Sequence, residues 1–142
     1  MSVSNVQFAV ACHILSVLAY CPRGQATSKE LAMSVCAHPT FVRKTVAKLG
    51  KAGLLNTTRG ATGACTLARP AEQITLLEIY RASEASPVFS LHSYPVEDAC
   101  EVSVNMKTRM DDVLKVAQAG VEEKLEMLTL RDLMPSVSLA DA

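Results

Sequence analysis

Apolar residues recur at helical spacing in the first part of the chain. They are Val6, Val10, Ile14, Val17 and Leu18, which share one side of a helix. The segment Cys21-Pro22-Arg23-Gly24 then ends the pattern, because proline and glycine both interrupt helices. The chain is therefore predicted to begin with a helix that ends before Pro22.

Two more helices are predicted before Gly53. Thr27 and Glu30 have the spacing of a capping box, in which the hydroxyl and the carboxylate satisfy free backbone donors at a helix start. This second helix runs to about Cys36. Pro39 suits the first position of a third helix, which is short and basic. Its apolar stripe is Val42, Val46 and Leu49, and its basic stripe is Lys44, Lys48 and Lys51.

A β-hairpin is predicted after the third helix. Gly53 suits a helix C-cap, and two short β-compatible segments follow, residues 54–58 and 65–68. The turn Arg59-Gly60-Ala61-Thr62-Gly63 lies between them. Three helices followed by a hairpin is the order of a winged helix-turn-helix domain. The predicted fold class is therefore mainly α with a small β wing.

A long helix is predicted near the end of the chain, with one apolar face and one acidic face. The apolar line is Met110, Leu114, Ala117, Val121, Leu125 and Leu128. One helix cannot bury such a face by itself, so another helix must cover it. We expect the same helix of a second copy to do so, which makes these residues the interface of a homodimer. Packing on the chain's own first helix is the alternative.

Charge is divided unequally along the chain. Residues 1–71 hold eight Lys and Arg against the single Glu30, whereas residues 72–142 hold six against thirteen acidic residues. The two halves therefore carry +7 and −7, although the whole chain is neutral. Such asymmetry indicates an anionic partner for the first half, and double-stranded DNA fits it. A solvated helix face is the alternative explanation of the basic stripe.

The third helix has the size and charge to enter a major groove, with the wing beside it. We expect DNA contacts from the second and third helices and from the wing. The candidate residues are Ser28, His38, Thr40, Arg43, Lys44, Lys48, Arg59, Gly60 and Thr62.

Several function classes are disfavoured. The longest apolar run, residues 8–21, falls short of the roughly 20 residues that a membrane-spanning helix needs, and it lacks the basic flank of a signal peptide. Five unevenly spaced cysteines are typical of reduced thiols in the cytoplasm. No CxxC pair, HExxH motif, phosphate-binding loop or catalytic set is recognisable. We expect a cytoplasmic protein with no enzyme activity, no bound metal or cofactor and no membrane partner.

Three short segments carry a family resemblance. They are Lys51-Ala52-Gly53-Leu54-Leu55, Arg59-Gly60, and Leu67-Ala68-Arg69-Pro70 with its continuation to Leu76. Together they resemble the Rrf-type (Rrf-two) family of bacterial transcription regulators, and the first helix is similar to its YwnA-like branch. The resemblance is close over residues 8–82 and looser to about residue 132. It implies a homodimer, a palindromic operator and a long C-terminal helix that crosses to the partner.

The sequence departs from the family pattern in two places. The family has consecutive glycines in the wing, whereas Gly60 and Gly63 are separated here. Cluster-binding members carry three cysteines before the long helix, but residues 83–106 contain Cys100 alone. A metal site built from Cys100 with His92 and nearby carboxylates would be irregular. The resemblance is thus to a branch without the three-cysteine cluster motif.

Cys100 is the candidate sensor residue. It is open to three interpretations: an inert remnant, a thiol whose oxidation or modification switches the regulator, or a ligand to an unforeseen group. Three of the other thiols are expected to be packed. Cys12 and Cys21 are assigned to the core or an interface, and Cys36 to the space beneath the turn after the second helix.

The sequence predicts three segments and one main function. Residues 1–82 form the winged helix-turn-helix domain, residues 83–132 a sensor loop and dimerisation helix, and residues 133–142 a C-terminal tail. The predicted function is a homodimeric transcriptional regulator, most simply a repressor, that binds a palindromic operator. Thiol oxidation or a small-molecule effector is its candidate input. A winged-helix protein-interaction module without DNA binding is the alternative, and the charge of the first half favours the regulator.

Overall fold

Three helices form the first part of the fold in a computed structural model that describes residues 5–58 and 63–135. They are α1 (Val6–Tyr20), α2 (Ser28–Val35) and α3 (Pro39–Lys51). Two further helices follow the wing, α4 (Leu76–Ala82) and α5 (Glu101–Met127). The first three helices agree with the sequence prediction in order and type. The wing residues Arg59, Gly60 and Thr62, which were expected to contact DNA, lie outside the described residues.

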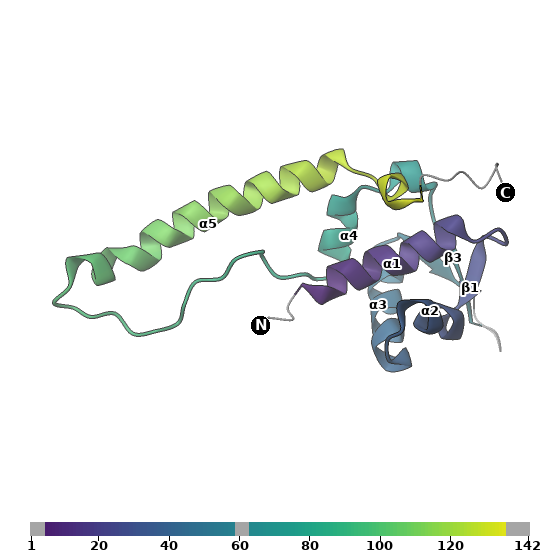
Figure 1. Cartoon of the computed structure of the whole chain (residues 1–142), viewed down its shortest axis with the longest axis horizontal. Coiled ribbons are helices and arrows are strands. Elements are labelled where there is room, and N and C mark those ends of the chain that lie inside the picture. The colour runs from purple at the N-terminus through teal and green to yellow at the C-terminus, as the bar shows by residue number, and fades with distance from the viewer. Residues whose placement is uncertain (1–4, 59–62, 136–142) are drawn as a thin grey trace.

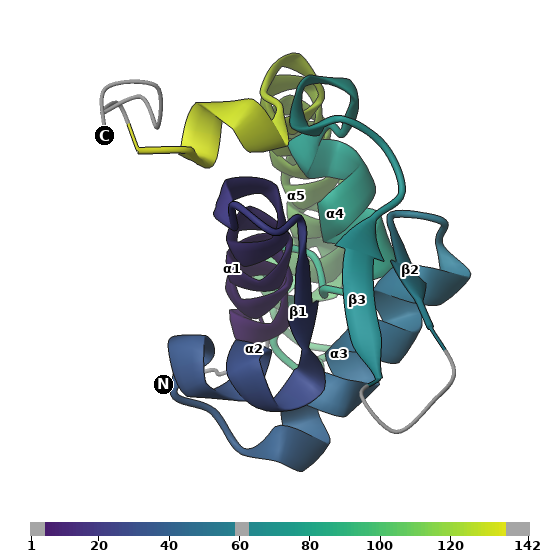
Figure 2. The same ribbon diagram turned by 90° about the vertical axis from the view of Figure 1, so that its right-hand side faces the viewer.

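A small antiparallel sheet stands beside the helices (Figure 2). Its strands β1 (Gln25–Thr27), β2 (Leu55–Thr57) and β3 (Ala64–Leu67) are arranged in the order β1-β3-β2. The β2–β3 pair is the predicted hairpin, with Asn56 opposite Thr66. Strand β1 is not evident in the sequence, because three residues are too few to show strand alternation. Only Ala26 of β1 is buried, opposite Cys65.

The core lies between α1, α2, α3 and the sheet. Ile14, Leu31 and Leu49, one from each helix, are inaccessible to solvent. Leu130 is equally buried, although it follows the long helix. It belongs to η2 (Leu130–Leu133), whose Leu130 N–H donates to the Ile74 carbonyl at 2.8 Å. The end of the long helix is therefore anchored to the domain formed by the first part of the chain.

Local sequence signals explain where the helices begin and end. The Thr27 hydroxyl caps α2 by accepting from Glu30 N–H at 3.1 Å. The expected capping box is only half formed, because the Glu30 carboxylate pairs with Arg23 at 3.4 Å instead of returning to Thr27. Gly53 follows α3 with a φ of +77°, a left-handed conformation that glycine adopts without steric cost.

The long helix α5 extends away from the rest of the molecule (Figure 1). Its C-terminal half packs on α4, where Arg81 lies 3.4 Å from Glu122 and the Gln118 amide donates to the Tyr80 hydroxyl at 3.0 Å. None of its residues is fully buried in the single chain. Intramolecular packing thus involves α4 rather than α1, and it covers only one end of α5.

Among the described residues, none of the helices is both long and apolar enough to cross a membrane.

Candidate nucleic-acid interface

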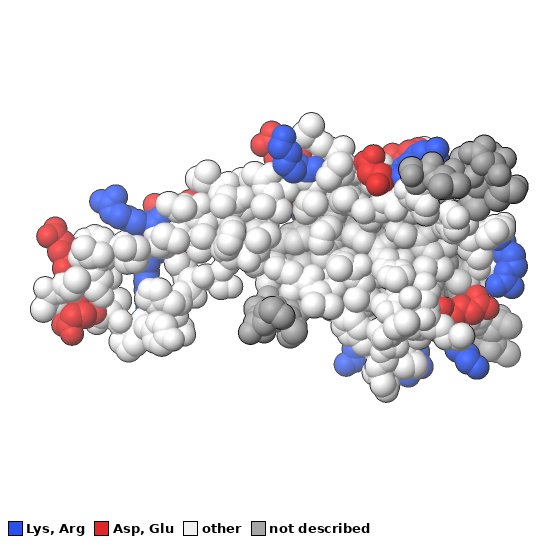
Figure 3. Space-filling model, viewed as in Figure 1, with Lys and Arg blue, Asp and Glu red and all other residues white. Residues whose placement is uncertain are grey.

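Helix α3 separates its apolar residues from its polar residues. Val42, Val46 and Leu49 are buried against the core. The opposite side is exposed and is formed by Thr40, Arg43, Lys44, Ala47 and Lys51. These five residues, here called the α3 strip, share one helix face, because Thr40, Lys44, Ala47 and Lys51 recur at steps of four, three and four and Arg43 lies three residues after Thr40. In Figure 3 basic atoms line the edge of the molecule beneath α2 and α3.

The first turn of α3 is held by side-chain hydrogen bonds. His38 precedes the helix, and its Nδ1 accepts from Thr40 N–H at 3.1 Å. This bond requires an unprotonated Nδ1, which leaves Nε2 as the ring donor. Arg43 in turn donates to the Thr40 hydroxyl at 3.3 Å. The guanidinium of Arg43 is therefore held near the helix N-terminus, the end that reads base edges in helix-turn-helix proteins.

Lys48 differs from the other lysines of α3. Its ammonium lies 3.2 Å from the Glu84 carboxylate, just beyond α4, and its side chain is 38% exposed. The sequence placed Lys48 in one basic stripe with Lys44 and Lys51. The structure instead puts it at the edge of that face and pairs it. Sequence reasoning missed Glu84 because the pair is distant along the chain and depends on the left-handed turn at Glu84, with a φ of +58°.

Ser28 is the first residue of α2, and it is half-buried. Its side chain lowers the pKa of the Cys65 thiol of β3, although the larger effect of burial raises that pKa. Lys29, beside it, is exposed. The described part of the predicted DNA-contact set therefore divides into the exposed residues of α3 and His38, the paired Lys48, and the half-buried Ser28.

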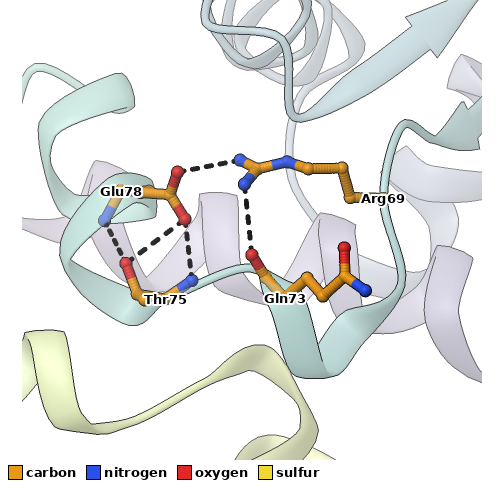
Figure 4. A network of polar contacts seen from close by, with 4 residues as sticks. All are labelled: Arg69, Gln73, Thr75 and Glu78. Atoms are coloured by element: carbon orange, nitrogen blue, oxygen red, sulfur yellow. Dashed lines mark hydrogen bonds and ion pairs between the residues drawn. The ribbon is translucent and has the colours of Figure 1, made fainter.

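The Leu67-Ala68-Arg69-Pro70 motif anchors the wing to α4 (Figure 4). Arg69 donates to the Gln73 carbonyl at 3.1 Å and to the Glu78 carboxylate at 2.9 Å. Glu78 and Thr75 form a complete capping box at the start of α4. Burial raises the pKa of Glu78. Hydrogen bonds from the Thr75 backbone and from the Arg69 guanidinium lower the pKa by more than burial raises it, so the net shift is downward. The motif is therefore a structural joint between the wing and the second half of the chain.

The five cysteines are all reduced, and they divide into two kinds. Cys12 and Cys65 are buried; burial raises the pKa of the Cys12 thiol to about 12 and also raises that of Cys65. Cys36 is exposed and Cys21 is half-exposed. The expectation that Cys36 would be packed was wrong, and Cys21 is not part of the core, so an interface is the assignment of Cys21 that stays a prediction. Helix α1 ends at Tyr20, so Cys21 falls in the following loop, and Cys36 occupies the left-handed C-cap of α2.

Cys100 lies at the N-cap of α5 and is exposed. Its sulfur accepts from Ser103 N–H at 3.4 Å, and the Ser103 hydroxyl accepts from Glu97 N–H at 2.8 Å. The candidate sensor residue therefore fixes the start of the long helix. Within the ranges that the structure describes, no three His, Cys, Asp or Glu side chains are grouped so that they could hold a metal ion.

The predicted interface residues of α5 are half-buried in the single chain. This holds for Met110, Leu114, Ala117, Val121 and Leu125, whereas Leu128 is 42% exposed. Leu125 packs against the chain's own core, and Leu128 lies one residue beyond the helix. A neighbouring face is more open, and it carries four exposed apolar residues around Arg109. Its residues Val102, Met106, Val113 and Val116 are here called the open α5 face.

These observations define the class of protein. Three helices, an antiparallel wing and an exposed basic face on the third helix constitute a winged helix-turn-helix domain, followed here by a long helix. The profile of the Rrf2 family, described as iron-dependent transcriptional regulator, matches residues 4–136. The chain belongs to this family of transcriptional regulators and is not an enzyme.

Individual relatives agree with this assignment. YwnA of Bacillus subtilis, described as an HTH-type transcriptional regulator, is 34% identical over 92% of this chain and 96% of its own. A crystal structure described as that of a DNA-binding protein is 29% identical, with a TM-score of 0.71 over 91% of this chain and 99% of that one. A transcriptional regulator from Lactobacillus plantarum has the same fold at 24% identity, with a TM-score of 0.74 over 90% and 87% of the two chains.

The family description names iron, which the residues of this chain do not fit. Soft thiolate ligands are what iron–sulfur clusters require, and a cluster takes several of them. Cys100 is the single cysteine between residues 83 and 106, and Cys12 and Cys65 are buried apart in the core. The other two thiols, Cys21 and Cys36, also lie outside any such group of potential ligands among the described residues.

Proposed function

We propose that this chain acts in the cytoplasm as a homodimer that binds a palindromic DNA operator and represses transcription. The observation that carries this proposal is the α3 strip, which exposes cations on one face of the third helix. The sequence between Glu30 and Glu72 contains no acidic residue, so the strip has no carboxylate of its own to neutralise it. A phosphate backbone is the polyanion that suits such a face.

The residues of the strip divide by position. Arg43 and Thr40 lie in the first turns of α3, where side chains reach base edges, and Arg43 has the geometry to bind guanine with two hydrogen bonds. Lys44, Lys51 and the Nε2 of His38 are assigned to phosphates, which fix position without reading sequence. Arg59, Gly60 and Thr62 of the wing, together with Ser28 and Lys48, complete the proposed contact set.

Dimerisation is proposed through α5. Val116 is 74% exposed and Val113 is 57% exposed, although both are apolar residues on a helix that already packs on α4 through another side. The same face of a second copy would cover them in an isologous interface. The half-buried Met110, Leu114, Ala117 and Val121 border this face, and we assign them to the same interface. Leu125 and Leu128 would contribute at its edge.

The proposed input acts on the start of α5. Cys100 is exposed and holds that helix end through its sulfur, so an adduct on the thiol would remove the cap. A change at the end of a dimer helix alters the spacing of two recognition helices, which must match half-sites about one helical turn apart. An oxidant or a small molecule bound near Cys100 would thereby release the operator.

Selection from a random DNA library, followed by gel shifts on the selected sequence, tests this function. The protein should enrich a palindrome and shift it as one complex that contains two copies of the chain. The DNA upstream of the chain's own gene is the first natural sequence to try. Failure to enrich any sequence would contradict the proposed DNA-binding function and would favour a protein-interaction module.

A further inference from the structure

The open α5 face is part of a longer repeat on the same helix. The repeat continues through four more exposed residues, Arg109, Gly120, Glu123 and Met127. Together the eight residues, here called the α5 seam, recur at alternating steps of four and three from Val102 to Met127. This is the heptad spacing of a helix that supercoils with another helix. The α5 seam lies on the side of the helix opposite Gln118 and Glu122, which contact α4.

Two residues of the α5 seam are charged, and neither is paired within the chain. Arg109 and Glu123 form no ion pair with any residue that the structure describes. The apolar residues between and around them remain in contact with water. A second helix that carries the same residues would cover the apolar positions and supply the opposite charges. The chain itself provides such a helix in a second copy of α5.

Gly120 leaves an open space in the α5 seam. A Cβ atom at this position would meet no other heavy atom within 4 Å, so packing within the chain does not require glycine here. Glycine in a helix interior also destabilises the helix relative to alanine. The space therefore has no use in the single chain, but a long side chain from a second helix can occupy it.

The charges decide how two copies of the α5 seam can pair. A parallel pair would set each seam residue beside its own counterpart, so that Arg109 meets Arg109 and Glu123 meets Glu123, which is repulsive. In an antiparallel pair, one register uses all eight positions of the seam. Across the interface Val102 then faces Met127, Met106 faces Glu123, Arg109 faces Gly120 and Val113 faces Val116. The long arginine side chain thus lies over the residue that has no side chain.

Side-chain direction brings the two charges of this register together. The side chains of an α-helix lean toward its N-terminus. Arg109 therefore leans toward the layer of Met106, which is the layer that contains Glu123 of the second copy. That Glu123 leans along its own helix toward Gly120, the residue that faces Arg109. The two side chains approach each other, and the two-fold symmetry of the pair repeats the contact.

We propose that two copies of α5 pair antiparallel in this register, and that Arg109 of each copy binds Glu123 of the other. This inference rests on the proposed homodimer and adds the residues that fix its orientation and register. The same register sets Met110 beside Ala117 of the second copy, which agrees with their assignment to the interface.

Shifting the register by one heptad separates the charges. In one direction Arg109 faces Val113, and Glu123 lies beyond the paired part of the helices. In the other direction Glu123 faces Val113, and Arg109 faces Met127. Either shift covers a charge without a partner, which is strongly unfavourable, and shortens the paired seam. The ion pair therefore selects one register among several that apolar packing alone would allow.

Charge reversal on the purified full-length protein tests the contact. Arg109→Glu and Glu123→Arg each create two repulsive contacts in a homodimer, so the dissociation constant of the dimer should rise at least about tenfold. When the two variants are mixed, each contact of a mixed dimer again joins opposite charges. The mixture should therefore form heterodimers with a dissociation constant within about threefold of the wild type. Sedimentation velocity measures the affinities, and native mass spectrometry identifies the heterodimer.

Two further variants separate this register from a general effect of charge or shape. Glu126→Arg makes the same charge change as Glu123→Arg at an exposed residue outside the α5 seam, and should dimerise like the wild type. Gly120→Leu adds apolar surface, which would strengthen an ordinary apolar interface. In the proposed register it occupies the space of Arg109 and should weaken dimerisation at least about fivefold without lowering the melting temperature of the chain. Adding Arg109→Ala to Gly120→Leu should restore the dimer.

The outcomes distinguish the register from the proposed function. A dimeric wild type whose charge variants dimerise equally well, or form no heterodimers when mixed, would overturn the register alone. A monomeric wild type would overturn both the register and the homodimer of the proposed function. Heterodimers that form as expected, with a wild type that binds no operator, would overturn the proposed DNA binding and leave the register standing.

Discussion

The Lys48 ammonium of the recognition helix lies 3.2 Å from the carboxylate of Glu84, the residue from which the chain leaves α4 toward the long helix. This contact joins the proposed DNA-binding face directly to the segment that connects α4 with α5. Any movement of that segment alters how strongly Lys48 is held. The pair is partly exposed, so its contribution to stability is small, and its main consequence is for the charge offered to DNA.

Glu84→Gln should release Lys48 and strengthen DNA binding. We expect about threefold higher affinity for operator and unrelated DNA alike, because a lysine reaching phosphate carries no sequence information. The slope of affinity against salt should steepen by about one unit per protomer. Fluorescence anisotropy titrations measure both quantities. The same substitution in a Lys48→Gln background should have no effect, and an effect that persists there would show that the pair is not its cause.

Val116→Asp should separate the dimer without unfolding the chain. Val116 is 74% exposed in the single chain, so the fold tolerates a carboxylate there, whereas a covered interface would bury two unpaired charges at a cost of several kcal/mol. Sedimentation velocity should show monomers with an unchanged circular dichroism spectrum and much weaker operator binding. Thr108→Asp places the same charge on a different face of α5 and serves as the control. A dimeric Val116→Asp protein would place the interface elsewhere.

Glu78→Gln should destabilise the fold in a pH-dependent manner. The pKa of Glu78 is lowered in the folded chain from its ordinary value of 4.5. Its ionised form therefore adds stability above that value, and this contribution is lost as the pH falls through the folded pKa. We expect a loss of about 1 kcal/mol at neutral pH, the typical value of a helix cap. Urea unfolding should show the difference from wild type shrinking below pH 4.5. A difference that stays constant with pH would exclude the ionised carboxylate as its source.

The elements that the sequence predicted correctly are those with strong local signals. The first helix has a long apolar pattern, Pro39 and Gly53 mark the two ends of α3, and a glycine-containing turn in the sequence marks the middle of the hairpin. These features depend on residues a few positions apart. They therefore sufficed for the winged helix-turn-helix class and for the exposed face of α3.

The features that the sequence did not predict depend on contacts between distant residues. Strand β1 is too short to show a pattern and exists because it pairs with β3. Periodicity identified α5 as a helix with an apolar face. It did not show that Gln118 and Glu122 would contact residues of α4 and so direct one side of α5 to that helix. Cys21 was assigned to the core or an interface because it lies beside an apolar helix. Helix α1 ends one residue earlier, which puts Cys21 in the loop before β1 and outside the core.

The salt dependence of operator binding tests the central claim, that the α3 strip is a DNA-reading surface, most directly. Affinity of the wild type, Arg43→Ala and Lys44→Ala proteins is measured for a selected palindrome and a scrambled duplex over a range of salt concentrations. With three strip cations in each of two protomers, the slope of log Kd against log salt should be about five or more. Arg43→Ala should lose affinity mainly for the palindrome, whereas Lys44→Ala should weaken both duplexes equally. A slope near zero, or equal losses on both duplexes for Arg43→Ala, would contradict the account.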